Sequence, residues 1–304
     1  MPSTSRKKTR GVALITGAST GFGRLIAETM ARNGYTVFAT MRGLAGKNAQ
    51  AAAELRDLAS RESVDLHPLE LDVTQESSVD HAVAAAAEKA GRIDIVINNA
   101  GYGVMGVTEA VTLEQSQGIM DTNFFGVVRV NRAVLPWMRR QKSGLLMYIS
   151  SGAGRLVSPG MAFYCASKFA MEALAEAYRY ELAAQGIDSV VIQPGPFATA
   201  VFKNLERAAD ESRNATYGPV AGVADQVSDS LTRSWANPQE LADAILKIIE
   251  TPAGERRFRY RIGGSGLGVD EINSVCERVQ QETLKVFGLT ELTRFVPPQQ
   301  STSA

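Results

Sequence analysis

The alternation of two residue patterns constrains the fold of this chain more than any other feature of its sequence. Short runs of β-branched and apolar residues are separated by longer stretches with helical periodicity. The expected strands are residues 12–16, 36–40, 64–71, 93–98, 144–150, 189–193 and 257–262, and the expected helices are residues 21–33, 48–60, 76–90, 113–141, 162–185, 238–250 and 268–287. This alternation predicts an α/β fold with a doubly wound, mostly parallel seven-stranded sheet and helices on both faces.

The length of 304 residues suits one large domain or two modest ones. No repeat and no low-complexity linker marks a second domain, so we expect a single domain over residues 10–290 with disordered tails at 1–9 and 291–304. Residues 200–236 do not fit the alternation. A long irregular insertion of this kind favours a lid over a substrate cleft, with helical pieces at 201–209 and 224–235, whereas the alternative is a variable surface loop.

Composition argues against several classes of protein. Acidic and basic residues balance at 32 each, which gives no bulk charge for nucleic acid or an anionic membrane. Cys165 and Cys276 are far apart, and His67 and His81 lack metal-ligand companions, so neither a disulfide framework nor a metal site is expected. No stretch approaches the roughly 20 apolar residues of a membrane span. We therefore expect a soluble protein of a reducing, cytoplasmic compartment.

A glycine-rich segment follows the first expected strand and opens the first expected helix. It reads Thr16-Gly17-Ala18-Ser19-Thr20-Gly21-Phe22-Gly23. Glycines allow a tight turn and let the backbone approach a pyrophosphate, which the helix N-terminus attracts. The spacing is GxxxGxG rather than GxGxxG, and an ordinary strand-to-helix connection is the alternative. At this place in the chain the segment favours a dinucleotide site in a Rossmann-type fold.

Tyr164 and Lys168 lie four residues apart and share one face of an expected helix. A nearby ammonium group stabilises a phenolate and lowers the pKa of a tyrosine from about 10. Such a pair can act as acid or base at the oxygen of an alcohol or ketone. The same spacing is also common on solvated helix faces, so the pair gains weight only from the other motifs.

Together these motifs resemble the short-chain dehydrogenase/reductase family. The residues TGxxxGxG at 16–23, Asn98-Asn99-Ala100-Gly101, Asn123, Ser151, Tyr164-xxx-Lys168 and Pro194-Gly195 match the family pattern in order, over about residues 10–200. The resemblance implies four catalytic residues, namely Asn123, Ser151, Tyr164 and Lys168. Tyr164 would be the general acid or base, Lys168 would lower its pKa and bind the nicotinamide ribose, Ser151 would bind the substrate oxygen, and Asn123 would hold a relay water. Ser150 is the neighbouring alternative to Ser151.

The resemblance also implies a nicotinamide dinucleotide site. Its expected residues are Gly17, Ser19, Thr20, Gly21, Phe22, Gly23, Arg42, Asp72, Val73, Asn99, Ala100, Gly101, Tyr164, Lys168, Pro194, Gly195, Phe197 and Thr199. An NAD enzyme usually has Asp or Glu at the end of the second strand, whereas Arg42 stands there and its guanidinium suits a 2′-phosphate. We therefore expect NADP as the cofactor, with NAD as the alternative.

The stretches at 38–42 and 164–170 look most like the hydroxysteroid and retinol dehydrogenase branch of the family, which implies a lipophilic substrate. Candidates for an apolar cleft wall are Val104, Met105, Leu156, Val157, Phe163, Phe197, Val201 and Phe202. We expect an oxidoreductase that interconverts a secondary alcohol and a ketone, or an alcohol and an aldehyde. The alternatives are a catalytically silent NADP-sensing regulator and a lyase or epimerase. Alanines at 166, 170, 173 and 177 would allow the helices 113–141 and 162–185 to pair in a homodimer or homotetramer.

Overall fold

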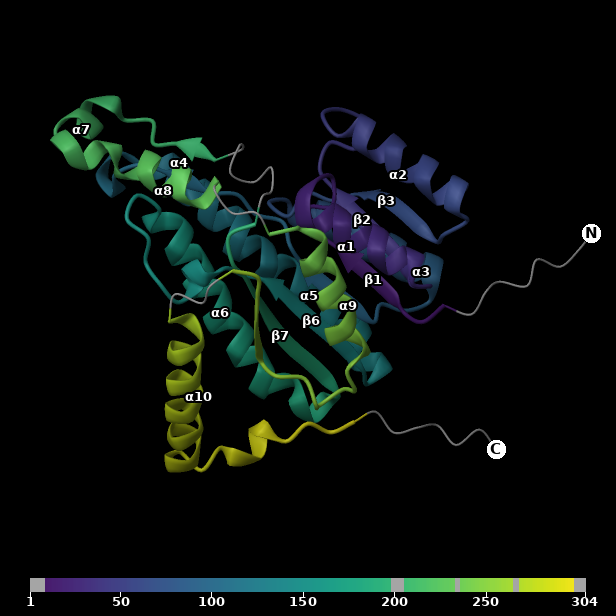
Figure 1. Ribbon diagram of the computed structural model, residues 1–304. Helices are drawn as coiled ribbons and strands as arrows, with labels where there is room; N and C mark the ends of the chain where they lie inside the picture. The colour runs from purple at the N-terminus through teal and green to yellow at the C-terminus, as the bar shows by residue number, and fades with distance from the viewer. Residues whose placement is uncertain (1–8, 198–204, 233–235, 265–267, 298–304) are drawn as a thin grey trace, which may run out of the picture.

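Seven strands form one parallel sheet in the computed structural model, which describes residues 9–197, 205–232, 236–264 and 268–297 (Figure 1). In spatial order they are β3 (Leu66–Glu70), β2 (Thr36–Met41), β1 (Val12–Ile15), β4 (Ile95–Asn98), β6 (Gly144–Ile149), β7 (Ile187–Pro194) and β9 (Arg259–Ile262). Every neighbouring pair in the sheet is parallel, which confirms the predicted fold class. The strand order reverses between β1 and β4, and ligands of such sheets bind beyond the carboxyl ends of the strands at that point.

Helices cover both faces of the sheet (Figure 1). On one face lie α1 (Gly21–Arg32), α2 (Ala49–Glu62) and α9 (Gln239–Glu250), and on the other lie α3 (Glu76–Ala90), α5 (Gly126–Gln141) and α6 (Ala162–Leu182). Along β1 the side chains alternate, because Ala13 and Ile15 join the first core and Val12 and Leu14 join the second. A strand buried on both faces needs the continuous apolar run that its sequence shows.

The expected single helix over 113–141 is divided by a wider turn. It consists of α4 (Leu113–Met120), a π-helical turn (Asp121–Phe125) and α5. A capping box starts α4, in which the Thr112 side chain accepts from the Gln115 backbone N–H and the Gln115 side chain returns to the Thr112 N–H. Single π-helical turns occur frequently at functional sites, and this one contains Asn123.

The described part of the insertion, residues 205–232, contributes one strand to a second, small sheet. Its strand β8 (Glu206–Arg207) pairs in parallel with β5 (Val104–Met105), and two short helices follow, α7 (Glu211–Ala215) and α8 (Val223–Thr232). The prediction of a helix over 201–209 is wrong at β8, because the backbone there is extended and hydrogen-bonds across to Gly103 and Met105. Residues 198–204 lie outside the described part of the chain, and α8 confirms the helix expected from residue 224 as far as Thr232.

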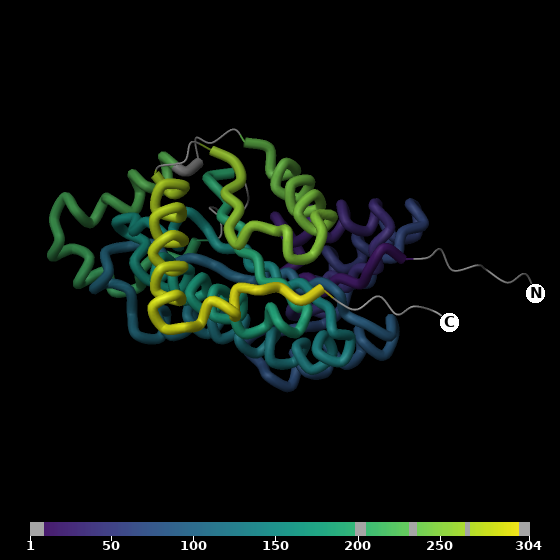
Figure 2. Tube along the Cα trace, turned by 90° about the horizontal axis from the view of Figure 1, so that it is seen from below, coloured from purple at the N-terminus to yellow at the C-terminus, as the bar shows by residue number. Residues whose placement is uncertain are grey.

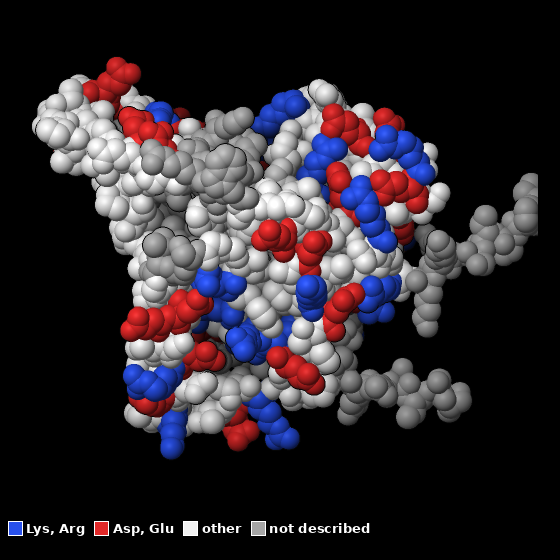
Figure 3. All heavy atoms as spheres, in the orientation of Figure 1, with Lys and Arg blue, Asp and Glu red and all other residues white. Residues whose placement is uncertain are grey.

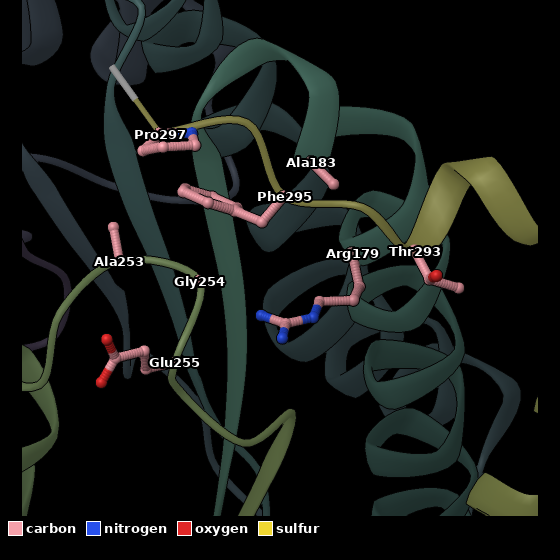
Figure 4. A pocket seen from close by; sticks show the side chains of 8 residues that line it. All are labelled: Arg179, Ala183, Ala253, Gly254, Glu255, Thr293, Phe295 and Pro297. Carbon is pink, nitrogen blue, oxygen red and sulfur yellow. The ribbon is translucent and has the colours of Figure 1, made fainter. Parts of the chain in front are cut away.

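The last described residues do not form the tail that the sequence indicates. After α10 (Val269–Val286) and a 3₁₀ turn (Thr290–Thr293), the Val296 N–H donates to the Ala183 carbonyl at 3.0 Å. Figure 2 shows this yellow segment running from α10 back across the molecule. With Arg179 and Gly254, Phe295 lines a hollow of about 330 Å³ far from the strands' carboxyl ends (Figure 4). Arg179 donates there to the buried Asp188 carboxylate, so the hollow lies above a satisfied ion pair.

Two surface properties can be stated for the described residues. On the face drawn in Figure 3, acidic and basic side chains lie next to one another and do not gather into a patch of one sign. Among the helices that the structure describes, none combines the length and the apolarity that crossing a bilayer would require.

Candidate active site

The turn after β1 is pressed against the segment that follows β4. A Cβ on Gly17, which has φ +67°, would lie 2.8 Å from the Ala100 Cα, and one on Gly23 would lie 2.5 Å from the Gly17 carbonyl oxygen. The Thr16 hydroxyl accepts from the N–H groups of Asn99 and Ala100, each at 3.0 Å. The glycines therefore allow a close approach that the Thr16 hydroxyl then fixes, and it brings together two of the predicted cofactor segments.

The N-terminus of α1 fits a dinucleotide phosphate. The helix begins at Gly21, whose φ is +58° and whose added Cβ would meet nothing within 4 Å. Thr20 makes no side-chain cap hydrogen bond, and the first turn contains no acidic residue. The N-terminus of the helix thus has no side-chain cap from Thr20 and no acidic residue in its first turn, which suits an anion such as a pyrophosphate.

Arg42 is exposed directly after β2, and no ion pair of its guanidinium is recorded within the described ranges. The nearby acid is otherwise engaged, because the Glu70 carboxylate accepts from the backbone N–H groups of Gly43 at 2.7 Å and Leu44 at 2.6 Å. Arg42 is therefore the charged side chain left to meet a ligand at the end of β2. This arrangement agrees with the sequence argument but does not by itself choose between NADP and NAD.

Several other predicted cofactor residues have structural roles in the protein. Asp72 accepts from the N–H of Thr74 at 3.0 Å and from its hydroxyl at 2.8 Å, which closes the turn after β3. Phe197 is only 1% exposed and packs edge-to-face on Phe22 with ring centroids 5.5 Å apart. Its side chain thus belongs to the core. Thr199, with Val201 and Phe202, lies outside the described residues.

Lys168 lies in the second turn of α6 and is 5% exposed. Its Nζ donates to the Ile149 carbonyl oxygen at 2.8 Å. Burial lowers the pKa of Lys168 to about 8, and the negative charge of Glu172 acts in the opposite direction. Lys168 is consequently a buried ammonium whose proton is held less firmly than that of a surface lysine.

Tyr164 and Ser151 meet at the start of α6. Burial raises the pKa of Tyr164, and a hydrogen bond with the Ser151 side chain opposes part of that rise. The Lys168 Nζ lies 5.6 Å from the centroid of the Tyr164 ring. The expectation that Lys168 lowers the pKa of Tyr164 is therefore not met in the protein alone, because burial has the larger effect. Ser150 is engaged elsewhere, since its hydroxyl donates to Glu172 at 2.8 Å, which leaves Ser151 as the residue beside Tyr164.

Asn123 lies beside Lys168 but is fully engaged with protein groups. Its Oδ1 accepts from the Tyr102 N–H at 3.0 Å, and its Nδ2 donates to the Tyr102 carbonyl at 2.9 Å and to the Ser167 hydroxyl at 3.0 Å. A Cβ on Gly101 would lie 3.0 Å from the Asn123 Oδ1 and 3.8 Å from the Lys168 Nζ. The structure thus brings the four predicted catalytic residues to one edge of the sheet, and the relay water stays a prediction.

The proposed cleft wall is only partly exposed. Val104 and Met105 are buried in packing contacts, Leu156 and Phe163 are half-buried, and Val157 is 70% exposed. The sequence reasoning also missed Glu172, a buried carboxylate one helical turn after Lys168. The spacing Lys168-xxx-Glu172 is visible in the sequence, but its burial is a property of the packed structure.

Comparison with known proteins extends this picture. The family model described as short chain dehydrogenase matches residues 11–210. A 3-ketodihydrosphingosine reductase of Bacteroides thetaiotaomicron is 35% identical over 252 residues, which are 83% of this chain and 87% of the relative. Human 17-beta-hydroxysteroid dehydrogenase type 1 is 33% identical over 260 residues, which are 82% of this chain and 77% of the relative.

Solved structures show the same arrangement of the chain. A short-chain dehydrogenase from Streptomyces avermitilis aligns with a TM-score of 0.75 and 29% identity, covering 93% of this chain and 98% of its own. An alcohol dehydrogenase from Thermococcus sibiricus, solved with 5-hydroxy-NADP, aligns with a TM-score of 0.67 and 25% identity, covering 83% of this chain and 95% of its own.

Proposed function

Because this chain belongs to the short-chain dehydrogenase/reductase family, we propose that it interconverts a secondary alcohol and a ketone, or an alcohol and an aldehyde, with a nicotinamide dinucleotide as cofactor. The observation that supports this activity best is the contact between Tyr164 and Ser151, next to a buried Lys168, at the edge of the sheet that carries the N-terminus of α1. A protein that only senses a nucleotide would not need Tyr164, Ser151 and Lys168 together at this place.

In the direction of reduction, the Tyr164 hydroxyl donates its proton to the substrate oxygen as that oxygen becomes an alcohol. The Ser151 hydroxyl hydrogen-bonds the same oxygen, where negative charge develops. The reduced nicotinamide, when bound, supplies the hydride. Lys168 would hold a positive charge near the tyrosine ring, and Asn123 would hold the water that links Lys168 to solvent as a proton relay. In oxidation the same groups act in reverse, with Tyr164 as the base.

The cofactor of this activity is NADP in our proposal. Arg42 is exposed after β2 without an acidic residue at the position that would bind a ribose 2′-hydroxyl, and a guanidinium forms paired hydrogen bonds with a phosphate. Ser19 and Thr20 stand at the turn before α1 as further hydrogen-bond donors.

We propose a lipophilic carbonyl compound or alcohol as the substrate. Two of the relatives carry the names of a ketosphingoid reductase and a hydroxysteroid dehydrogenase, both of which act on largely apolar molecules. We further propose that the enzyme works in the cytoplasm as a homodimer or homotetramer, paired through α5 and α6. The exposed alanines on α6 support that assembly.

Substitution of Tyr164 by Phe tests the function, because it removes the proton donor and keeps the ring. We expect NADPH oxidation with lipophilic ketones to fall by about 10²- to 10⁴-fold, while calorimetric NADPH affinity stays close to that of the wild type, since the variant keeps the aromatic ring. Tyr180→Phe, on the same helix but bonded to Glu176, is the matched control and should keep wild-type turnover. Undiminished turnover in Tyr164→Phe would show that the site is misplaced, and NADPH binding without turnover of any ketone or alcohol by the wild type would favour the sensor.

A further inference from the structure

Glu172 is a buried carboxylate on the face of α6 that carries Lys168. It is 1% exposed, and each of its oxygens has a donor from another element. Oε1 accepts from the Ser150 hydroxyl at 2.8 Å and from the Gln193 side chain at 2.9 Å, and Oε2 accepts from the Arg259 Nε at 3.1 Å. A carboxylate buried this deeply would be costly without such partners.

The partners of Glu172 belong to the segments that form the candidate active site. Ser150 precedes Ser151, and Gln193 precedes the Pro194-Gly195 turn. Gln193 also accepts from the Asn273 side chain at 2.7 Å, which extends the network to α10. One carboxylate therefore ties together the ends of β6 and β7, the start of β9 and α10.

The loop that follows Ser151 lies directly on this carboxylate. A Cβ on Gly154 would lie 2.5 Å from the Glu172 Oε1 and 2.7 Å from the Ser150 hydroxyl oxygen, so only glycine fits there. Arg155, the next residue, forms an ion pair with Glu172, with 3.1 Å between its Nε and the carboxylate Oε2. The conformation of the loop, and with it the position of Ser151, thus depends on Glu172.

The charged groups that face Lys168 and Glu172 come from several elements. Tyr164 and Glu172 face Lys168 from α6, Arg155 comes from the loop after β6, and Arg259 comes from β9. Arg259 is shared with Glu176, at 2.6 Å. Glu172 is the carboxylate whose negative charge acts on Lys168, so loss of that charge would leave the buried ammonium without it.

We propose that Glu172 is a positioning residue of the reaction, which holds the Ser151 loop against α6 and supplies the negative charge that keeps Lys168 protonated at neutral pH. This inference rests on the proposed function for its effect on turnover. The effect of the Glu172 charge on the Lys168 proton does not rest on it, because that effect can be measured on the protein without cofactor or substrate.

Glu172→Gln tests the charge, because the amide keeps the size of the side chain. In the folded protein the pKa of Lys168 is about 8, below its value of about 10.4 in an unfolded chain. Between these values the unfolded state holds a proton that the folded state has released, so this lysine makes stability rise with pH. We expect the rise to begin about one pH unit lower in Glu172→Gln. Urea unfolding at pH values from 6 to 10 gives the free energy of unfolding of each variant. Subtracting the same curve for a protein with Lys168→Met isolates the contribution of Lys168 and its onset.

The kinetic arm uses the pH profile of kcat/KM for ketone reduction. Activity should fall as Lys168 loses its proton, and this alkaline limb should move to lower pH in Glu172→Gln by the same amount as the unfolding onset. Glu176→Gln is the matched control, since it removes a carboxylate bonded to the same Arg259 one turn further along α6. Its limb should stay at the wild-type pH. Glu172→Asp, which keeps the charge, should recover most of the shift.

The outcomes distinguish an electrostatic role of Glu172 from a purely structural one, and both from failure of the proposed function. In Glu172→Gln, the rise in stability and the alkaline fall of kcat/KM could both stay at the wild-type pH, with rates lowered equally at all pH values. That result would overturn the assignment of the charge to Glu172. If Glu172→Gln does not fold, Glu172→Gln/Arg155→Gln also removes the arginine left without its carboxylate, and its onset should still lie below the wild-type pH; an onset at the wild-type pH would contradict the proposal. If the wild type shows no turnover, the proposed function is wrong. The unfolding experiment still tests the effect of Glu172 on Lys168 in that case.

Discussion

Arg42 stands where one side chain can decide between two cofactors. It is exposed directly after β2, and Glu70 at the end of β3 is engaged by the backbone N–H groups of Gly43 and Leu44. A 2′-phosphate bound there would meet the guanidinium as a charge-assisted hydrogen-bond partner. A 2′-hydroxyl would gain little from it.

We therefore predict that Arg42→Ala weakens NADPH binding by about tenfold to a hundredfold, the value of a hydrogen bond to a charged group, and leaves NADH binding unchanged. Isothermal titration calorimetry with both cofactors measures the difference. Arg56→Ala, an exposed arginine on the neighbouring α2, is the control for a general loss of positive charge. Equal losses for the two cofactors, or tighter NADH binding by the wild type, would refute the choice of NADP.

Single residues also show what the sequence could reveal about the site. The proximity of Tyr164, Lys168 and Ser151 can be expected from their spacing, because helical geometry and strand ends bring residues at such spacings together. The raised pKa of Tyr164 and the contacts of Glu172 are not visible in the sequence, since the first depends on burial and the second on partners from β7, β9 and the end of β6. Phe197 shows the same limit, because its position in a cofactor motif does not reveal that its ring packs on Phe22.

At the scale of elements, two glycines at the start of α1 are needed for different reasons. The Cβ of an alanine at 21 would enter open space in front of the helix, whereas that of an alanine at 23 would collide with the Gly17 carbonyl. We predict that Gly21→Ala loses about 1–2 kcal/mol of folding free energy from its left-handed backbone and binds NADPH at least tenfold more weakly, because the methyl group occupies the expected phosphate position.

Gly23→Ala should behave differently, with a larger loss of thermal stability, since the backbone of α1 must move away from the turn after β1. Differential scanning calorimetry and NADPH titration of both variants separate the two effects. Unchanged NADPH affinity in a folded Gly21→Ala variant would show that the phosphate does not lie at this helix terminus.

Long elements were predictable, whereas short ones were not. The strands of the main sheet and the helices that cover it follow from hydrophobic periodicity, which a run of four or more residues can display. β5 and β8 have two residues each and form strands only by pairing with one another, so no local sequence pattern predicts them. The π-helical turn at 121–125 likewise lies inside a sequence whose periodicity reads as one continuous helix.

For the whole molecule, α6 presents a surface that suits a second copy of the chain. Ala166, Ala173 and Ala177 are exposed and Ala170 is half-buried, at successive spacings of four, three and four residues. This spacing forms one stripe along a helix, and small side chains there let another helix approach closely. Exposed apolar residues also occur on α10, where Val275, Val279 and Val286 stand apart from the main sheet.

We predict that Ala173→Arg converts the assembled enzyme into smaller species, because an arginine in a closely packed helix seam brings both steric overlap and two like charges related by symmetry. Light scattering coupled to size-exclusion chromatography measures the mass, and Ala53→Arg on the exposed face of α2 is the matched control, which should keep the wild-type mass. If Ala173→Arg also keeps that mass and Val279→Arg on α10 lowers it, the copies pair through α10 and the assignment of the interface to α5 and α6 fails. A wild type that is monomeric at micromolar concentration would contradict the assembly itself, and the alanine stripe would then remain a solvated helix face.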